Sequence, residues 1–169
     1  MQMMAAILDL PGITSKEIVP LAFAVLLGGI IGFEREWNGK PAGLRTNILI
    51  CMGATLLTIV GRHLSPETDG VTRVVQGIVT GIGFLGAGAI IQSGDGVHGR
   101  TTAASIWLVT SIGVACGAGL FGLATVVTCM MLLTLLGLLP ITRWVRSRRD
   151  RLNGRAGNGG NSNHSEASQ

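Results

Sequence analysis

Charged residues and tyrosine are scarce in this chain of 169 residues. Asp, Glu, Lys and Arg together make up 13%, tyrosine is absent, and apolar residues make up 47%. A water-soluble domain of this size needs more polar surface than this composition supplies, which disfavours the class of soluble globular proteins. Long uncharged runs and 26 glycines are instead typical of a protein with several membrane spans.

Cysteine pairs and catalytic sets are also missing. Cys51, Cys116 and Cys129 lie in apolar runs without CxxC or Cys/His spacing, which argues against a disulfide framework or a zinc site. We interpret them as small packing residues. No Ser/His/Asp or Cys/His set is present in the sequence, so we expect a protein that is not an enzyme. The net charge of +4 is concentrated in the tail, so it does not indicate nucleic-acid binding.

Charge-free runs predict an all-α membrane protein with five transmembrane helices. Four such runs are present, at 18–33, 46–61, 74–94 and 101–142. The last is too long for one crossing and divides at Gly117-Ala118-Gly119, because glycine is a frequent helix breaker. A run of 16 residues covers only about 24 Å as helix, against a hydrocarbon core of about 30 Å. We therefore expect the first two helices to include flanking residues such as Glu34, Arg45 and Arg62.

The distribution of Lys and Arg predicts the orientation in the membrane. Ten of them lie in the first loop, at Arg100 and in the tail after residue 142, whereas only Lys16, Arg62 and Arg73 lie on the other side. The positive-inside rule then places the N-terminus outside and the C-terminus in the cytoplasm. The expected domains are an outside segment (1–17), a five-helix membrane domain (18–142) and a basic, disordered tail (143–169).

Glycine is concentrated in the third run, where residues 80–90 read TGIGFLGAGAI. Five glycines are candidates for helix packing or for a site near the membrane midplane: Gly77, Gly81, Gly83, Gly86 and Gly88. On a helical wheel the first two and the last share one side, and the other two lie roughly opposite. Because small residues let helices approach closely in lipid, we expect this helix to be the central one, with Phe84 as a knob between its neighbours. Gly28/Gly32 and Gly113/Gly117 show the same four-residue spacing.

The third run is open to a second interpretation. Glycines near mid-membrane could break the helix and expose backbone groups to an ion. The polar side chains Arg73, Gln76 and Thr80 share one side of the wheel with Gly83. Alternatively, Gln76 and Thr80 only hydrogen-bond to a neighbouring helix. The literal GxGxxG match in this run is not a dinucleotide site, because no strand precedes it.

Polar residues cluster at the predicted inner ends of the helices. They are Glu34, Arg35, Glu36, Arg45, Thr46, Asp95, Thr101 and Thr102. Ionisable groups below the head groups need partners, so a Glu34–Arg45 pair is one expectation and snorkelling toward the interface is the alternative. The carboxylates of this set could attract Mg²⁺, which prefers oxygen ligands; no other cofactor is expected. Either Thr101 or Thr102 could cap the following helix.

Three stretches resemble the MgtC/SapB family of bacterial membrane proteins. They read GGIIGFEREWNGKPAGLRTNILICMGA (28–54), TRVVQGIVTGIGFLGAGAII (72–91) and HGRTTAASIWLVTSIGVACGAG (98–119). The resemblance implies a five-helix protein of the bacterial inner membrane. It places the family's shared polar positions on Glu34, Arg35, Arg45, Thr46, Arg73, Thr101 and Thr102, with Trp107 beside them.

The resemblance also implies a function. Members of the family are associated with growth at low Mg²⁺ and with survival of pathogens in host cells, and the MgtC branch with restraint of the membrane ATP synthase. We therefore expect a non-enzymatic modulator, with the lipid bilayer, ATP synthase and a second copy of the chain as candidate partners. The alternative is a transporter or channel for Mg²⁺ or another small solute. The chain differs from the usual pattern at Arg100, where Leu is common, and in having a short basic tail in place of a soluble C-terminal domain.

Overall fold

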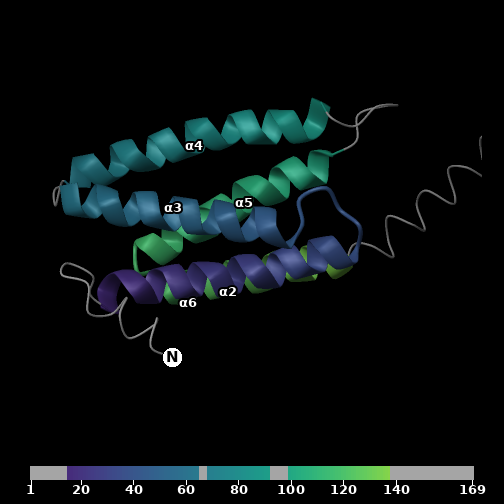
Figure 1. The fold of residues 1–169 in the computed structure, drawn as a ribbon, viewed down its shortest axis with the longest axis horizontal. Coiled ribbons are helices and arrows are strands. Elements are labelled where there is room, and N and C mark those ends of the chain that lie inside the picture. The colour runs from purple at the N-terminus through teal and green to yellow at the C-terminus, as the bar shows by residue number, and fades with distance from the viewer. Residues whose placement is uncertain (1–14, 65–67, 92–98, 138–169) are drawn as a thin grey trace, which may run out of the picture. The chain divides into compact units, whose positions relative to one another are not determined.

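The computed structural model describes residues 15–64, 68–91 and 99–137, and the regular structure in these ranges is entirely helical. The helices are α2 (Ser15–Trp37), α3 (Leu44–Leu64), α4 (Thr68–Ile91), α5 (Arg100–Gly117) and α6 (Phe121–Gly137), as Figure 1 shows. The expected all-α fold is confirmed for these residues. Most of the predicted outer segment, the whole tail and Asp95 lie outside the described residues.

Three of these helices are long and apolar enough to cross a membrane: Lys16–Trp37, Leu44–Leu64 and Gly70–Ile90. Phe121–Gly137 is apolar but shorter. The expected extension of the short runs is confirmed, because α2 includes Glu34 and α3 includes Arg45 and Arg62. Many large apolar side chains are exposed, Phe33, Leu49 and Leu133 among them, which is the surface that a bilayer would cover.

The break between α5 and α6 lies where the glycines predict it. Gly119 has a φ of 80°, a left-handed conformation that favours glycine. The amide of Leu120 donates to the carbonyl of Ala115 and the amide of Gly119 donates to the carbonyl of Cys116, each at 2.9 Å. This pair of bonds is a Schellman motif, which satisfies the last carbonyls of α5 and reverses the chain.

Helices α3 and α5 form the centre of the packed unit. They contact each other, and each also contacts α2 and α4, which lie on either side of them in Figure 1. Their shared interior holds Cys51 and Ala54 from α3 and Val109, Ile112 and Cys116 from α5, all buried. The prediction that α4 is the central helix is therefore wrong.

The close helix contacts are made by glycines of α2 and α5. A Cβ at Gly28 would lie 2.9 Å from the Asn47 carbonyl oxygen, and one at Gly32 would lie 2.7 Å from the Leu44 Cα. At Gly117 a Cβ would lie 2.6 Å from the Thr58 Cβ. Real Cβ atoms do not come this close, so only glycine fits at these contacts. The two pairs with four-residue spacing thus bring α2 and α5 against α3, as small residues do in membrane helices.

A shared hydroxyl proton joins α3 to α5. The Thr55 hydroxyl donates to the Cys51 carbonyl on its own helix at 2.9 Å and to the Gly113 carbonyl on α5 at 2.8 Å. Thr55 is fully buried. The two central helices are therefore connected by a polar contact as well as by packing.

The helices up to Cys129 form one compact unit, and the last two turns of α6, from Met130, belong to a second. Within the first unit, the rings of Phe23 and Phe121 lie 4.8 Å apart and join α2 to the start of α6. Ala124 and Thr128 of α6 are buried.

Candidate functional site

A buried arginine marks the end of the unit where α2 ends and where α3 and α5 begin; we call this the Arg35 end. The Arg35 side chain is 2% exposed, and its Nη2 donates a hydrogen bond of 2.8 Å to Oγ1 of Thr102, 67 positions later in the chain. Thr102 is also buried. A hydrogen bond to a charged group contributes about 1.5–3 kcal/mol, so this contact holds α2 to the first turn of α5.

Asn47 forms a second buried polar centre at the start of α3. Its side chain is fully buried, and Nδ2 donates to the carbonyls of Ala42 at 2.9 Å and Gly43 at 2.8 Å. These bonds fix the loop that leads into α3. The sequence analysis did not single out Asn47, although an amide inside an apolar run is the signal that could have found it.

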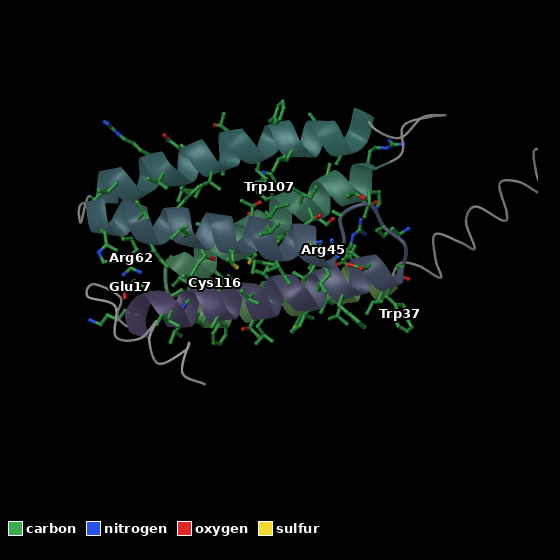
Figure 2. All side chains as sticks on the ribbon, in the orientation of Figure 1. Glu17, Trp37, Arg45, Arg62, Trp107 and Cys116 are labelled. Atoms are coloured by element: carbon green, nitrogen blue, oxygen red, sulfur yellow. The ribbon has the colours of Figure 1, made fainter. Side chains whose placement is uncertain are left out.

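Two carboxylates of α2 bind donors near the same loop. Oε2 of Glu36 accepts a 2.8 Å bond from the Leu44 amide, which neutralises part of the positive N-terminus of α3. Oε1 of Glu34 accepts a 2.8 Å bond from Nδ2 of Asn38. The expected Glu34–Arg45 pair is wrong: the Arg45 side chain, which Figure 2 labels at this end, is exposed and makes no ion pair with Glu34 in the described structure. The pair fails because Glu34 turns toward its own helix end, whereas Arg45 faces outward.

Three buried side-chain atoms of the Arg35 end have no hydrogen-bond partner in the described part of the chain. They are Nε of Arg35, Oε2 of Glu34 and Oδ1 of Asn47. Buried polar groups are nearly always hydrogen-bonded, because an unpaired one costs about 1–3 kcal/mol. The end therefore contains one unsatisfied donor and two unsatisfied acceptors.

The structure brings together only part of the predicted polar set. Arg35 and Thr102 are buried and bonded, Glu34 lies beside them, and Thr46 and Thr101 are exposed at the same end. Asp95 lies outside the described residues, so the expectation of Mg²⁺ near the three carboxylates stays a prediction. The described residues contain no group of three or more His, Cys, Asp or Glu side chains placed to hold a metal ion.

The predicted polar stripe of α4 lies on the exposed surface of the unit. Arg73, Gln76, Thr80 and Gly83 are all exposed. The Thr80 hydroxyl donates to the Gln76 carbonyl of its own helix at 2.9 Å, not to a neighbouring helix. Because α4 runs unbroken from Thr68 to Ile91, the expectation of a broken helix at mid-membrane is wrong.

The glycines of α4 do not mediate close packing among the residues that the structure describes. At Gly77, Gly81, Gly83 and Gly88 an added Cβ would meet nothing within 4 Å, and at Gly86 it would lie 3.9 Å from the Ala103 Cβ. Phe84 is 81% exposed and does not act as a knob. Helix α4 instead packs through Ile78 and Ile82, which are buried. The prediction that these glycines pack against other helices of the chain is therefore not met in the described residues.

The three cysteines differ in their burial. Cys51 of α3 and Cys116 of α5 are buried at the centre of the unit, as predicted for packing residues, whereas Cys129 of α6 is exposed. Figure 2 marks Cys116 near the middle of the helices.

Two small cavities lie away from the Arg35 end. One, of about 110 Å³, lies between α4 and α5 and is lined mainly by apolar side chains, with Trp107 and Ser111 on the α5 side. The other, of about 190 Å³, lies at the opposite end, where His63 Nε2 is 3.3 Å from Glu17 Oε1. At that end Nη1 of Arg62 also donates to the Gly117 carbonyl at 3.1 Å.

Comparison with known proteins identifies the family. A family model described as MgtC family matches residues 21–144, a range that contains the whole polar cluster of the Arg35 end. The chain belongs to the MgtC family. Protein MgtC of Brucella abortus (strain 2308) is 49% identical to it over 108 residues, which is 64% of this chain and 45% of that protein. Protein MgtC of Salmonella typhimurium (strain 14028s) is 46% identical over 111 residues, 66% of this chain and 47% of that protein.

The chain spans about half the length of these MgtC relatives. No solved structure matches it. The family model covers most of α2 and all of α3, α4, α5 and α6.

Proposed function

We propose that the protein is a non-enzymatic, multi-pass protein of the bacterial inner membrane that acts by binding another membrane protein. In this proposal it supports adaptation to low Mg²⁺, and virulence where the host limits Mg²⁺, by modulating a partner such as ATP synthase. Its N-terminus lies outside and its C-terminus in the cytoplasm. Family membership supports the general role.

The observation that carries the proposal is the open glycine face of α4. Gly77, Gly81 and Gly88 share one side of the helix, and a Cβ added at any of them would meet nothing within 4 Å in the described structure. In lipid, a helix face made of glycines is stabilised mainly by van der Waals contact with another closely packed helix, and much less by contact with hydrocarbon tails. The exposed Gln76 amide on α4 adds a group that favours a polar partner over lipid.

Leucine substitution on α4 tests the proposal. Gly81→Leu has room within the chain, so folding is retained, but the side chain blocks close approach of a partner helix. We expect this variant to lose co-purification of ATP synthase subunits in mild detergent and to fail to restore growth at low Mg²⁺ in a strain lacking the gene. The matched control is Gly122→Leu on α6, where a Cβ also meets nothing within 4 Å.

Equal growth and equal recovery of ATP synthase for Gly81→Leu and the wild type would contradict the partner role of this face. Recovery of a second tagged copy of the chain, lost in the same variant, would instead assign the face to a homo-oligomer.

Transport of Mg²⁺ or another small solute is the competing function. A transport path needs polar groups that line an opening through the helices, whereas the α4 stripe is exposed and the cavity between α4 and α5 is small and mainly apolar. The geometry thus favours the modulator. Flux of Mg²⁺ into liposomes containing the purified chain, reduced by Gln76→Leu, would reverse this preference.

A further inference from the structure

Helix α4 lies at the edge of the packed unit, where it contacts α3 and α5 (Figure 1). In its most apolar stretch 11% of the residues are buried, against 39% in the corresponding stretches of α2 and α3. Its packed side includes the buried Ile82, which lies in one cluster with Ile106 of α5. In the membrane location proposed above, the remaining sides of α4 face lipid or a partner.

One exposed side of α4 combines polar and small residues. At about 100° per residue, four of them lie within about 60° of one another: Gln76, Thr80, Gly83 and Ala87. We call these four residues, all of which are exposed, the Gln76 seam. Spacings of four, three and four residues form the 3.5-residue repeat with which two helices pack along their length, at a crossing angle of about 20°. The seam is about 110° around the helix from the glycine face used in the proposed function.

The side-chain amide of Gln76 makes no hydrogen bond to another residue that the structure describes. The Gln76 carbonyl accepts the bond from the Thr80 hydroxyl, but the amide itself is exposed. Gln76 lies about 9 Å along the helix from Gly70, where the membrane-spanning segment begins. Because hydrocarbon offers no hydrogen-bond partner, an amide at this depth is stabilised by a polar group on another helix.

A second copy of the chain supplies such a group at the correct depth. Copies with the same orientation in the membrane present α4 in parallel, and a twofold axis along the membrane normal places each residue opposite itself. A side-chain amide carries both donors and an acceptor, so the two Gln76 side chains donate to each other. Farther along the seam, Gly83 and Ala87 are small enough for the two backbones to approach closely.

Arg73 is the charged group that opposes this contact. It is exposed on the same side of α4, one turn nearer the start of the helix. A twofold axis would bring two such arginines toward each other. The long arginine side chain extends to the head groups while its stem stays on the helix, and like charges there are screened beyond about 8 Å at physiological salt. The charges therefore lie outside the contact between the two helices.

We propose that the Gln76 seam mediates a parallel, twofold-symmetric homodimer of this chain. The inference rests on the membrane location proposed above, but not on the partner or the role proposed there. The dimer leaves the side of α4 with Gly77, Gly81 and Gly88 open, so that a different membrane protein has a separate surface to bind.

Cysteine cross-linking in native membranes tests the location of the contact. The full chain carries either Gly83→Cys, in the seam, or Gly81→Cys, about 160° away, with the exposed Cys129 replaced by alanine. The two variants are matched, because at both glycines an added Cβ would meet nothing within 4 Å in the described structure. Copper phenanthroline oxidises two facing thiols to a disulfide. We expect a covalent dimer for Gly83→Cys and none for Gly81→Cys.

Energy transfer between donor-labelled and acceptor-labelled copies in liposomes measures the strength of the dimer as lipid content rises. Gln76→Leu keeps a side chain of similar size but removes the amide. We expect it to raise the dissociation constant about 3- to 30-fold, as the loss of an interhelical hydrogen bond in a membrane does. Gly83→Leu fills the seam and should weaken the dimer at least as much. Gly81→Leu is the control and should dimerise like the wild type.

Three results would each overturn the proposal: monomers at every protein-to-lipid ratio, equal cross-linking at the two glycines, or an unchanged dissociation constant for Gln76→Leu. Cross-linking of Gly83→Cys to a different protein or to none would overturn it as well. The proposed function fails separately. Undiminished recovery of ATP synthase by Gly81→Leu contradicts the partner role of the glycine face, whereas the dimer is judged by Gly83 and Gln76 alone.

Discussion

At the scale of single residues, a few buried polar groups decide how the helices are held. Arg35 reaches from α2 to Thr102 on α5, and Asn47 binds the loop before α3. The Arg35 contact joins residues 67 positions apart in the chain, whereas the Asn47 contact is local and fixes the loop just before its own helix. Removal of one partner leaves the other buried and unpaired, which is more costly than the bond itself is stabilising.

Thr102→Val tests the arginine contact. Valine keeps the shape of threonine but leaves Arg35 Nη2 without its acceptor, so we expect a loss of about 1.5–3 kcal/mol in the free energy of unfolding. The measurement is thermal unfolding of the protein purified in mild detergent. The neighbouring Thr101→Val is the control, because the Thr101 side chain is exposed and the hydrogen bond from Arg35 goes to Thr102. An equal effect of the two substitutions would show that the Arg35 contact contributes nothing.

At the scale of helices, glycine has two opposite roles in the chain. In α2 and α5 it allows backbones to touch, whereas in α4 it is exposed. The same residue type therefore predicts a tight interface in one helix and an unfilled face in another. Space around the glycine, not its presence, decides which role it has.

Alanine scanning of glycines separates the two roles. Gly117→Ala would push a Cβ to 2.6 Å from the Thr58 Cβ, and such overpacking costs about 1–3 kcal/mol. Gly53→Ala on α3 meets nothing within 4 Å and should be neutral or stabilising by up to about 1 kcal/mol. Thermal unfolding of both variants checks the contrast. Destabilisation of the same size at both positions would refute the assignment of the contact to Gly117.

Sequence alone predicted the helices but not all of their neighbours. Charge-free runs and the break at Gly119 follow from local chemistry, so both were predictable. The partner of Arg35 depends on how α2 and α5 are rotated about their axes, and this rotation cannot be predicted from the charge-free runs. The expected pair with Arg45 failed for the same reason. Glycine spacing likewise shows that α4 has smooth faces without showing whether any helix of the chain covers them.

At the scale of the whole molecule, the uneven charge distribution predicts how the chain lies in the bilayer. The loop between α2 and α3 carries Lys40 near Arg35 and Arg45, and the opposite end carries His63 and Arg62. Figure 2 shows Arg45 at one end of the helices and Arg62 at the other. By the positive-inside rule we expect the first of these ends to face the cytoplasm.

Cysteine labelling in cells tests this orientation. Lys40→Cys and His63→Cys both place a thiol at an exposed position, in a background where the exposed Cys129 is replaced by alanine. An impermeant maleimide added to whole cells should label position 63 and leave position 40 unlabelled until the membrane is opened. Labelling of position 40 in intact cells would mean that the orientation is inverted.

The hydroxyl proton that Thr55 shares between two carbonyls has a mechanical consequence. Sliding of α5 along α3 by a single residue would carry the Gly113 oxygen about 1.5 Å away and leave the proton on its own helix alone. The Thr55 hydroxyl thus favours one axial register between α3 and α5. We therefore expect any large relative movement of helices in this unit to involve α2 or α4 and not the α3–α5 pair.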